Sequence, residues 1–480
     1  MTEAAFVRTQ MLQPETPPVA ERGVVKWLRE NLFSGPLNTV LTLLGILVVF
    51  YLLKWALPWF LNGVWNAGSL GECRRIIAAN AGPDASGACW AMIRERWNQF
   101  LFGLYPVDEY WRPTMTFFLL FAAIAPVLLF GNRRAATVIV GAAGLLMAAA
   151  FFGLAVPSPV FLAGAAIVLA LYCLAEVAPR RLLWFAMLYP ALSFWLLWGG
   201  SVWRPICALA GFALMFLLFR LLAARIGPVV AMVTGFLAAC AWWLFLQSDV
   251  SAALTSAMPV TLKPVTSDQF GGFLLAIIIG VTAIISSLPM GIVLALGRKS
   301  DMPLIKMLCV GFIEFFRGVP LITVLFSANY MLLYFLPPRT NFDLILRVII
   351  VVVIFASAYI AEVVRGGLAA LPRGQYEAAD ALGLDYWQAQ RLIIMPQALK
   401  ISIPGIVSSF IGLFKDTTLV ALVGLMDPLQ GVTKIVRADI NWKGIYWEPY
   451  IFVGAIFFIF CFSMSRYSMY LERKLKRDHR

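Results

Sequence analysis

The chain has 480 residues, of which 61% are hydrophobic and only 13% charged. Because soluble domains carry roughly a quarter charged residues, this composition excludes an ordinary soluble globular protein and predicts an all-α polytopic membrane protein. The net charge of +13 does not indicate a nucleic-acid partner, since the Lys and Arg residues are spread over many loops instead of gathering in one patch.

The N-terminal stretch, residues 1–35, precedes the first apolar run. Residues 1–21 contain Pro14, Pro17 and Pro18 and lack an apolar core, which is typical of a disordered tail and not of a cleavable signal. Residues 24–33 can lie amphipathically in the membrane interface. We therefore expect a cytoplasmic tail followed by an interfacial helix.

Long apolar runs recur along the remaining chain, each near the ~20 residues needed to cross a bilayer. Counting these runs predicts about twelve transmembrane helices and an all-α polytopic architecture. Lys and Arg concentrate in alternate loops, and the positive-inside rule then places both termini in the cytoplasm. The predicted spans are 36–57, 113–131, 135–155, 158–178, 181–199, 205–222, 227–247, 271–297, 318–336, 344–365, 401–425 and 448–470.

An N-terminal membrane extension, residues 36–247, accounts for about the first seven of these spans, and we expect it to enlarge or brace the membrane body. Its one long loop, 58–112, is predicted to be periplasmic and is rich in Trp and Tyr, which favours a position at the membrane interface over a docking surface for a periplasmic partner. Cys73 and Cys89 share this loop. The compartment permits a disulfide worth roughly 3 kcal/mol, and two unrelated thiols are the alternative.

A polar stretch, 248–270, is predicted to be a periplasmic linker to the C-terminal part, 271–480. That part contains a cytoplasmic loop, 366–400, in which good helix formers end at Gly383, a natural left-handed residue. Asp385 can cap a second short helix, and Pro396 prevents that helix from continuing undistorted. The loop thus predicts a helix–turn–helix on the cytoplasmic face, with a plain amphipathic connector as the alternative.

Several chemistries are missing from the sequence. The only histidine is His479, so the sequence does not predict His-based catalysis or a His metal site. No phosphate-binding loop of the G-x-x-x-x-G-K-[ST] type occurs. We therefore expect neither an enzyme nor a bound metal or cofactor, and any energy from ATP has to come from another polypeptide.

The loop Glu377–Pro396 reads E-A-A-x₃-G-x₉-I-x-M-P, and this spacing resembles the cytoplasmic loop of membrane subunits of ATP-binding-cassette (ABC) importers. Segments 314–321, 361–367 and 415–419 are similar to signatures of permeases for polar amino acids. The segment 32–39 and the loop with the two cysteines resemble the general L-amino-acid importer subunit.

The resemblance implies a five-helix type I importer core over 271–480 and a position in the bacterial inner membrane. It implies import of L-amino acids, with membrane lipid around the chain. The implied partners are a dimer of ATPase subunits that binds ATP and Mg, a second related permease and a periplasmic amino-acid-binding protein. It implies that the ATPase-coupling residues are Glu377, Ala378, Ala379, Asp380, Gly383, Asp385, Arg391 and Pro396. A self-sufficient secondary transporter or channel is the alternative function.

Polar residues inside the predicted spans are candidates for the substrate pathway. Glu362 and Arg365 lie one turn apart and fit an ion pair or lipid anchor equally well. Asn329, Ser357 and Tyr359 lie deeper, where bonding between helices is the main alternative. Lys415 and Asp416 interrupt a span.

Overall fold

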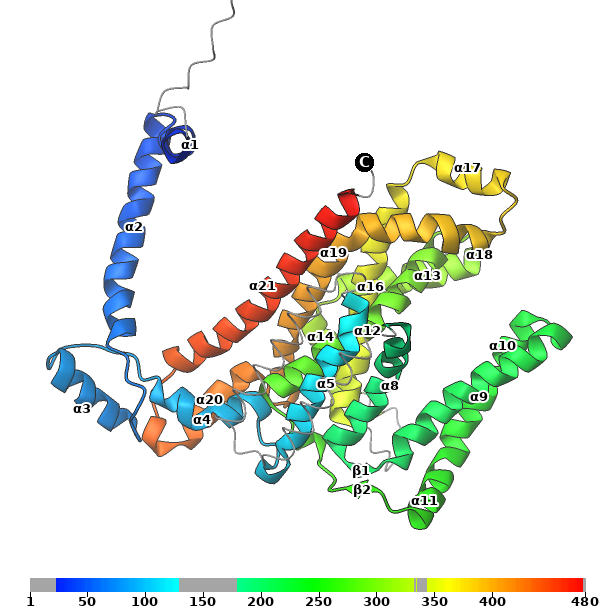
Figure 1. Ribbon diagram of the computed structural model, residues 1–480, viewed down its shortest axis with the longest axis horizontal. Coiled ribbons are helices and arrows are strands. Elements are labelled where there is room, and N and C mark those ends of the chain that lie inside the picture. Colours follow the sequence, from blue (N-terminus) through cyan, green and yellow to red (C-terminus); the bar gives the residue numbers. More distant parts are fainter. Residues whose placement is uncertain (1–22, 129–178, 332–333, 335–342, 478–480) are drawn as a thin grey trace, which may run out of the picture. The chain divides into compact units, whose positions relative to one another are not determined.

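The computed structural model describes residues 23–128, 179–331, 334 and 343–477 (Figure 1). The chain divides into two compact units, residues 1–94 and 95–480, and each is described by itself. The predicted all-α class is confirmed, because helices make up the described regular structure except for one pair of two-residue strands. The predicted spans 135–155 and 158–178 lie outside the described residues.

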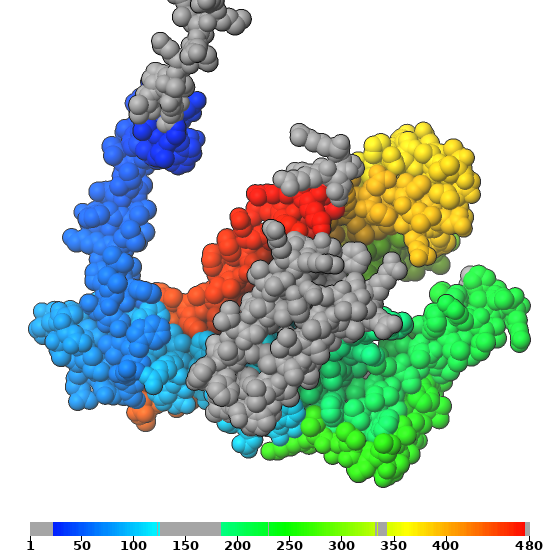
Figure 2. Space-filling model, in the orientation of Figure 1, coloured from blue at the N-terminus to red at the C-terminus, as the bar shows by residue number. Residues whose placement is uncertain are grey.

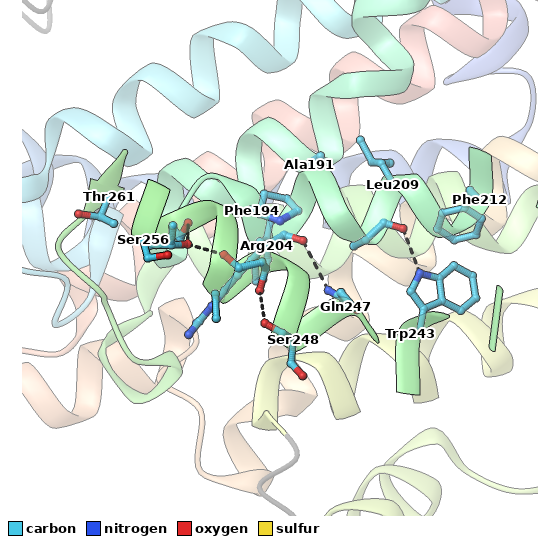
Figure 3. Close-up of a pocket in the computed structure, with 16 residues that line it drawn as sticks. Ala191, Phe194, Arg204, Leu209, Phe212, Trp243, Gln247, Ser248, Ser256 and Thr261 are labelled. Atoms are coloured by element: carbon cyan, nitrogen blue, oxygen red, sulfur yellow. Dashed lines mark hydrogen bonds between the residues drawn. The ribbon is translucent and has the colours of Figure 1, made fainter. Parts of the chain in front are cut away.

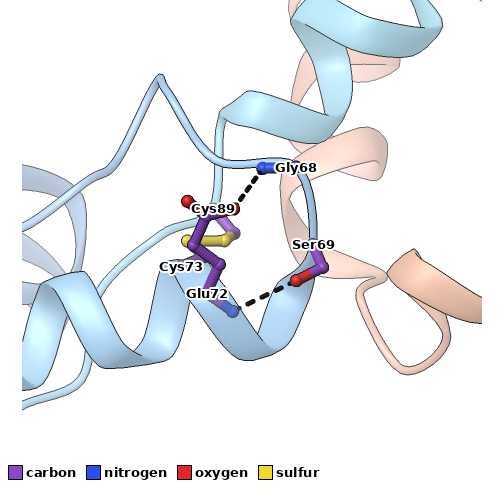
Figure 4. Close-up of a disulfide and its surroundings, with 5 residues drawn as sticks. All are labelled: Gly68, Ser69, Glu72, Cys73 and Cys89. Carbon is purple, nitrogen blue, oxygen red and sulfur yellow. Dashed lines mark hydrogen bonds between the residues drawn. A yellow bond between two sulfur atoms is a disulfide. The ribbon is translucent and has the colours of Figure 1, made fainter.

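The first unit contains the helices α1 (Gly23–Asn31), α2 (Pro36–Leu61) and α3 (Leu70–Ala81). Helix α2 begins at Pro36, as predicted, because proline fits the first helical position, where its missing N–H is not needed. Cys73 and Cys89, for which the sequence leaves two states open, form a disulfide (Figure 4). This disulfide joins α3 to the segment that follows it.

Aromatic rings of the same unit pack around one tryptophan. Trp90 is buried, and its ring centroid lies 5.7 Å from that of Trp59, 5.3 Å from that of Phe60 and 5.7 Å from that of Trp65. Edge-to-face and stacked pairs at this spacing stabilise a fold beyond the area they bury. Some of the aromatic residues of the predicted loop therefore form a small core within this unit.

In the second unit the described part of the extension continues as a series of helices. It comprises α4 (Ala91–Phe102), where the chain enters this unit, the 3₁₀ helix Val107–Glu109, α5 (Trp111–Leu128), α8 (Pro179–Trp198), α9 (Trp203–Ile226), α10 (Pro228–Ala241), the π-helix Trp242–Leu246 and α11 (Gln247–Ala257). Strand β1 (Gly200–Ser201) pairs antiparallel with β2 (Thr261–Leu262).

The stretch 248–270, predicted to be a linker, differs from that prediction. Its first half is helix α11, and its middle supplies β2. Ser248 and Asp249, taken as linker residues, lie in the first turn of α11, where an acidic side chain favours the helix dipole. Ala252, Ala253 and Leu254 are good helix formers and continue it.

A buried arginine connects the start of α5 to the chain after β2. Arg112 is 1% exposed; its Nε lies 2.8 Å from Glu109, and its Nη1 donates to the carbonyl of Lys263 at 2.6 Å. Nearby, the hydroxyl of Tyr105 donates to the carbonyl of Leu197 at 2.7 Å, and burial raises the pKa of this tyrosine. The Arg112 contact with Lys263 fixes α5 to the segment that leads into the C-terminal part, and the Tyr105 contact holds the chain before α5 against the end of α8.

The C-terminal part is built on four long helices, α12 (Gly272–Arg298), α16 (Leu344–Ala369), α19 (Met395–Asp416) and α21 (Trp447–Arg477). Helix α12 packs along α16, α16 along α19, and α19 along α21. The remaining elements are α13 (Pro303–Gly318), α14 (Leu321–Tyr330), α17 (Arg373–Ala381), α18 (Tyr386–Ala389), the π-helix Gln390–Ile394, the 3₁₀ helices Thr417–Val423 and Ile440–Trp442, the 3₁₀ helix Ser267–Gln269 and α20 (Pro428–Ala438).

The predicted span 318–336 begins at a sharp bend of the chain. Helices α13 and α14 meet at an angle of 101°. Pro320 has no N–H for a helical hydrogen bond, and it forces the preceding residue into extended geometry; Val319 has φ −101° and ψ 135°. The residues between the predicted spans 271–297 and 318–336 include most of helix α13. The number of predicted spans is not confirmed, because the described residues contain seven helices long and apolar enough to cross a membrane, or eight counting this bent pair.

Three glycines let α12, α16 and α19 approach closely. A Cβ on Gly291 of α12 would stand 2.6 Å from the side chain of Ile360, and one on Gly405 of α19 would stand 2.7 Å from Val363. A Cβ on Gly367 of α16 would stand 2.5 Å from the carbonyl oxygen of Ala398. Such small residues are what allows helices to pack tightly inside a membrane.

Gly367 and its neighbour Gly366 provide a matched test of this packing. Gly367→Ala would place a methyl group against backbone, so we expect it to destabilise the protein by about 1–3 kcal/mol. A Cβ on Gly366 meets nothing within 4 Å, so Gly366→Ala should leave stability unchanged or raise it. Thermal unfolding of the purified protein measures both, and equal Tm values for the two variants would contradict the packing.

Candidate functional site

The cytoplasmic segment predicted from the sequence is a helix–turn–helix over residues 373–394, called the knob below. Helix α17 ends in a Schellman motif, with Leu384 N–H donating to the carbonyl of Ala379 at 3.2 Å and Gly383 N–H to that of Asp380 at 2.9 Å. Gly383 has φ +70°, a left-handed geometry that glycine adopts without strain. The turn therefore depends on a glycine at this position.

The second helix of the knob begins at the predicted cap. The carboxylate of Asp385 accepts from the N–H of Gln388 at 2.8 Å, and the Gln388 side chain accepts from the N–H of Asp385 at 3.2 Å. This reciprocal capping box satisfies two N–H groups that the first turn leaves open. The π-helix Gln390–Ile394 follows and leads directly into Pro396. A proline lacks an N–H, and such wide turns are one way a helix accommodates it.

Most of the predicted coupling residues lie on the knob surface, but one does not. Ala379 is 1% exposed, so it packs inward, and of the two predicted alanines only Ala378 is exposed. The exposed members of the set are Glu377, Ala378, Asp380, Gly383, Asp385, Arg391 and Pro396.

Exposed apolar side chains accompany these residues, and the sequence analysis missed their role. Leu382 is 72% exposed, Trp387 70%, Leu392 63% and Tyr386 54%. Figure 2 shows residues around α17 as an exposed lobe, in yellow. Apolar side chains grouped beside charged ones are typical of a protein-docking surface. The sequence does contain a signal for this surface, because large apolar residues are unexpected in a loop predicted to be cytoplasmic.

The knob is fixed to the ends of the long helices. Lys299, at the end of α12, donates from Nζ to the hydroxyl of Tyr376 at 2.6 Å and lies 4.1 Å from the centre of that ring. On the other side, the Gln397 amide of α19 donates to Gln375 at 2.9 Å. These two contacts attach α17 to the end of α12 and to the start of α19, so a force on the knob acts on both helices.

A buried apolar cluster lies beneath these contacts and fills the junction of the knob with the helix ends. Its members come from α12, α13, α16, α19 and the knob, and they include Ala295, Ile313, Val364, Leu368, Leu371, Ile394 and Ala398. Side chains packed at this density transmit displacement because they cannot be compressed easily.

A cluster of charges surrounds Glu362 at the same end of α16. Its carboxylate accepts from Arg365 Nε at 2.9 Å and lies 3.4 Å from Arg298 of α12 and 3.6 Å from Arg317 of α13. Arg298 also pairs with Glu314 at 2.7 Å. Glu362 is therefore a shared anion that joins three helices, as the ion-pair interpretation of Glu362 and Arg365 requires. No substrate contact is needed to explain these two residues.

The other substrate-pathway candidates do not form one site. Ser357 is fully buried and donates to the carbonyl of Val353 in its own helix at 2.6 Å. The Asn329 side chain accepts from Arg347 at 3.2 Å, and Tyr359 stacks against Phe355 with centroids 5.0 Å apart. Their substrate role stays a prediction.

Lys415 and Asp416 lie where α19 changes into the 3₁₀ helix Thr417–Val423. Lys415 is exposed and Asp416 is half-buried. No ion pair joins them among the described residues. The interruption predicted from the sequence is thus a change of helix type, and its part in transport stays a prediction.

Known proteins resemble this chain along its whole length. The family model described as "Binding-protein-dependent transport system inner membrane component" matches residues 287–477. The glutamate/glutamine/aspartate/asparagine transport system permease protein BztC of Rhodobacter capsulatus is 61% identical, covering 100% of both chains. The inner membrane amino-acid ABC transporter permease protein YhdY of Escherichia coli is 36% identical over 93% of this chain and 92% of its own.

Among solved structures, an amino acid ABC transporter crystallised with histidines is 30% identical. It aligns with 42% of this chain and 91% of its own, with a TM-score of 0.38. The residues that the family model matches include the knob and all five members of the charge cluster around Glu362.

Proposed function

This chain belongs to the family of binding-protein-dependent transport system inner membrane components, the permease subunits of ABC importers, and on that premise we propose how it is driven and what it carries. The knob receives the ATPase, and the substrates are acidic amino acids and their amides. The observation that carries the proposal is the combination of an exposed apolar surface on the knob with its attachment to α12 and α19.

Coupling follows from that attachment. An ATPase subunit docks on the exposed face formed by Leu382, Tyr386, Trp387 and Leu392, with Glu377 available to a basic residue of the partner. When nucleotide changes the ATPase, the knob moves with it, and Tyr376 and Gln375 transmit this movement to the ends of α12 and α19. The nucleotide state then biases two arrangements of the membrane helices, as linkage requires.

The partners follow the same logic. ATP and Mg bind to a dimer of ATPase subunits and not to this chain, and a periplasmic amino-acid-binding protein delivers the substrate. A second, related permease completes the pathway across the bacterial inner membrane. Both termini lie in the cytoplasm, which puts the knob on the side where ATP is available.

The substrate proposal rests on the relative from Rhodobacter capsulatus, whose name gives glutamate, glutamine, aspartate and asparagine. These four share the α-amino and α-carboxyl groups and a short side chain ending in a carboxylate or amide. One pathway accommodates them if its groups donate hydrogen bonds to the side-chain carbonyl oxygen that all four share.

The coupling surface is tested by Trp387→Glu. An interface tryptophan typically contributes ~2 kcal/mol or more, so we expect co-purification of the ATPase and amino-acid uptake to fall by about ten-fold or more. Ile440→Glu, at a residue 90% exposed outside the knob, is the control for ATPase co-purification. Unchanged co-purification with Trp387→Glu in a protein of normal Tm would contradict the surface.

The substrate range is tested by competition. Uptake of labelled glutamate, in cells that lack this subunit and are complemented with it, should be reduced by excess aspartate, glutamine and asparagine. Arginine and leucine should compete poorly, because neither side chain ends in a carboxyl or amide carbonyl. Strong competition by arginine, with none by glutamine, would overturn the proposed range while leaving the coupling mechanism intact.

A further inference from the structure

A cavity of about 1100 Å³ lies between α8, α9 and α11 in the membrane extension (Figure 3). Neither the knob nor the charge cluster contributes to it. A free amino acid would leave most of this volume unfilled. The cavity is large enough for a drug-sized or larger ligand, so its occupant has to be sought outside the transported substrates.

The cavity has one polar end and one apolar end. Three hydrogen bonds join β1 and α9 to α11 and the π-helix along the cavity: Ser201 with Thr255 at 2.6 Å, the Gln247 amide to the Arg204 carbonyl at 3.5 Å, and the Trp243 indole N–H to the Ala208 carbonyl at 3.0 Å. The polar end is lined by Ser201, Arg204, Ser248, Ser251, Thr255, Ser256 and Thr261, and the apolar end by Ala208, Leu209, Phe212 and Trp243, with Ala191 and Phe194 from α8.

Arg204 supplies a cation at the polar end. Its side chain is exposed, and it takes no part in the ion pairs formed among the described residues. Arg112 and Arg298, by contrast, each have a carboxylate partner within 3 Å. A guanidinium binds phosphate well because its planar donors match two oxygens at once.

The apolar end lies about two helical turns along α9 from that cation. From Arg204 to Phe212 is eight residues along α9, or about 12 Å at 1.5 Å per residue. Trp243 closes this end against α9, where Gly211 leaves room for its indole: a Cβ on Gly211 would overlap it. A cation followed by an apolar trough of this length fits a charged headgroup followed by a hydrocarbon chain.

The surface around the cavity is apolar and exposed. Beside the cavity, Ile206, Phe216 and Leu217 of α9 are 45%, 59% and 54% exposed, and Leu244 and Phe245 of the π-helix are 74% and 72% exposed. Both Trp203–Ile226 and Val230–Ala257 are long and apolar enough to cross a membrane. A ligand reaches the cavity from the bilayer, where phospholipids are the abundant molecules with a charged head and an apolar tail.

We propose that this cavity binds one anionic phospholipid, with its phosphate on Arg204 and an acyl chain along Leu209, Phe212 and Trp243. The lipid fills the space between α8 and the α9–α11 hairpin and so braces the extension. This assignment rests on the membrane placement in the proposed function, but not on coupling or substrate range.

Quenching of Trp243 by brominated lipid tests the proposal. The full transporter is reconstituted in nanodiscs of phosphatidylcholine with increasing dibromostearoyl phosphatidylglycerol, and the signal is the difference from Trp243→Phe. We expect saturable quenching, with about ten-fold more lipid required for Arg204→Gln, since a hydrogen bond to a charged group contributes this much. Ala191→Phe, which fills the cavity, should reduce the quenching. Arg225→Gln, at the other end of α9, is the control and should leave it unchanged.

Other outcomes would overturn the assignment. Equal quenching by brominated phosphatidylcholine would remove the role of the anionic headgroup, and displacement by glycerol 3-phosphate alone would indicate a soluble anion. Absence of Trp243 quenching by any lipid would mean that protein occupies the cavity. Because Trp387→Glu should retain the quenching, failure of the lipid site and failure of ATPase coupling can be told apart.

Discussion

The close approach of α12, α16 and α19 is the constraint on which the rest of this structure depends. Inside a bilayer the lipid tails are as apolar as leucine, so helices associate through contact and not through the hydrophobic effect. Gly291, Gly367 and Gly405 remove the side chains that would separate these helices. The contact then extends to the helix ends, where the buried apolar cluster and the carboxylate of Glu362 join α12, α13 and α16.

The knob gains its function from this junction. A flexible surface loop would bend when a partner pushed on it and would not transmit the displacement to the helices. Here Tyr376 is held by Lys299, and Gln375 by Gln397, so the short helix α17 is attached to two spans at once. Its exposed apolar face provides the docking surface, and its attachments provide the route into the membrane. Both properties are needed for an ATPase on a separate chain to act on the pathway.

The shape of the knob was predictable from local chemistry, because Gly383 and Asp385 act within a few residues of their own position. Contacts between distant segments were not. Ala378 and Ala379 are equivalent in the sequence, yet packing buries only the second. The pairing of Glu362 with Arg365 could be predicted from their spacing in one helix. Its pairing with the arginines on α12 and α13 could not, because those residues approach Glu362 only when the chain folds. The 101° bend at Pro320 follows from the effect of a proline on the residue before it, whereas helix α13, which precedes the bend, lies outside the spans predicted from the sequence.

A distance measurement between α17 and the turn that joins α12 to α13 tests most directly whether the knob moves with the membrane helices. Spin labels at Asp380 and Met302, both exposed, are placed in a complex without other free cysteines and measured by double electron–electron resonance. The account predicts one narrow distance distribution that is the same with and without ATP, because the two labels belong to one rigid body. A distribution that broadens or shifts with nucleotide would mean that the knob moves independently of α12, and would contradict the coupling route.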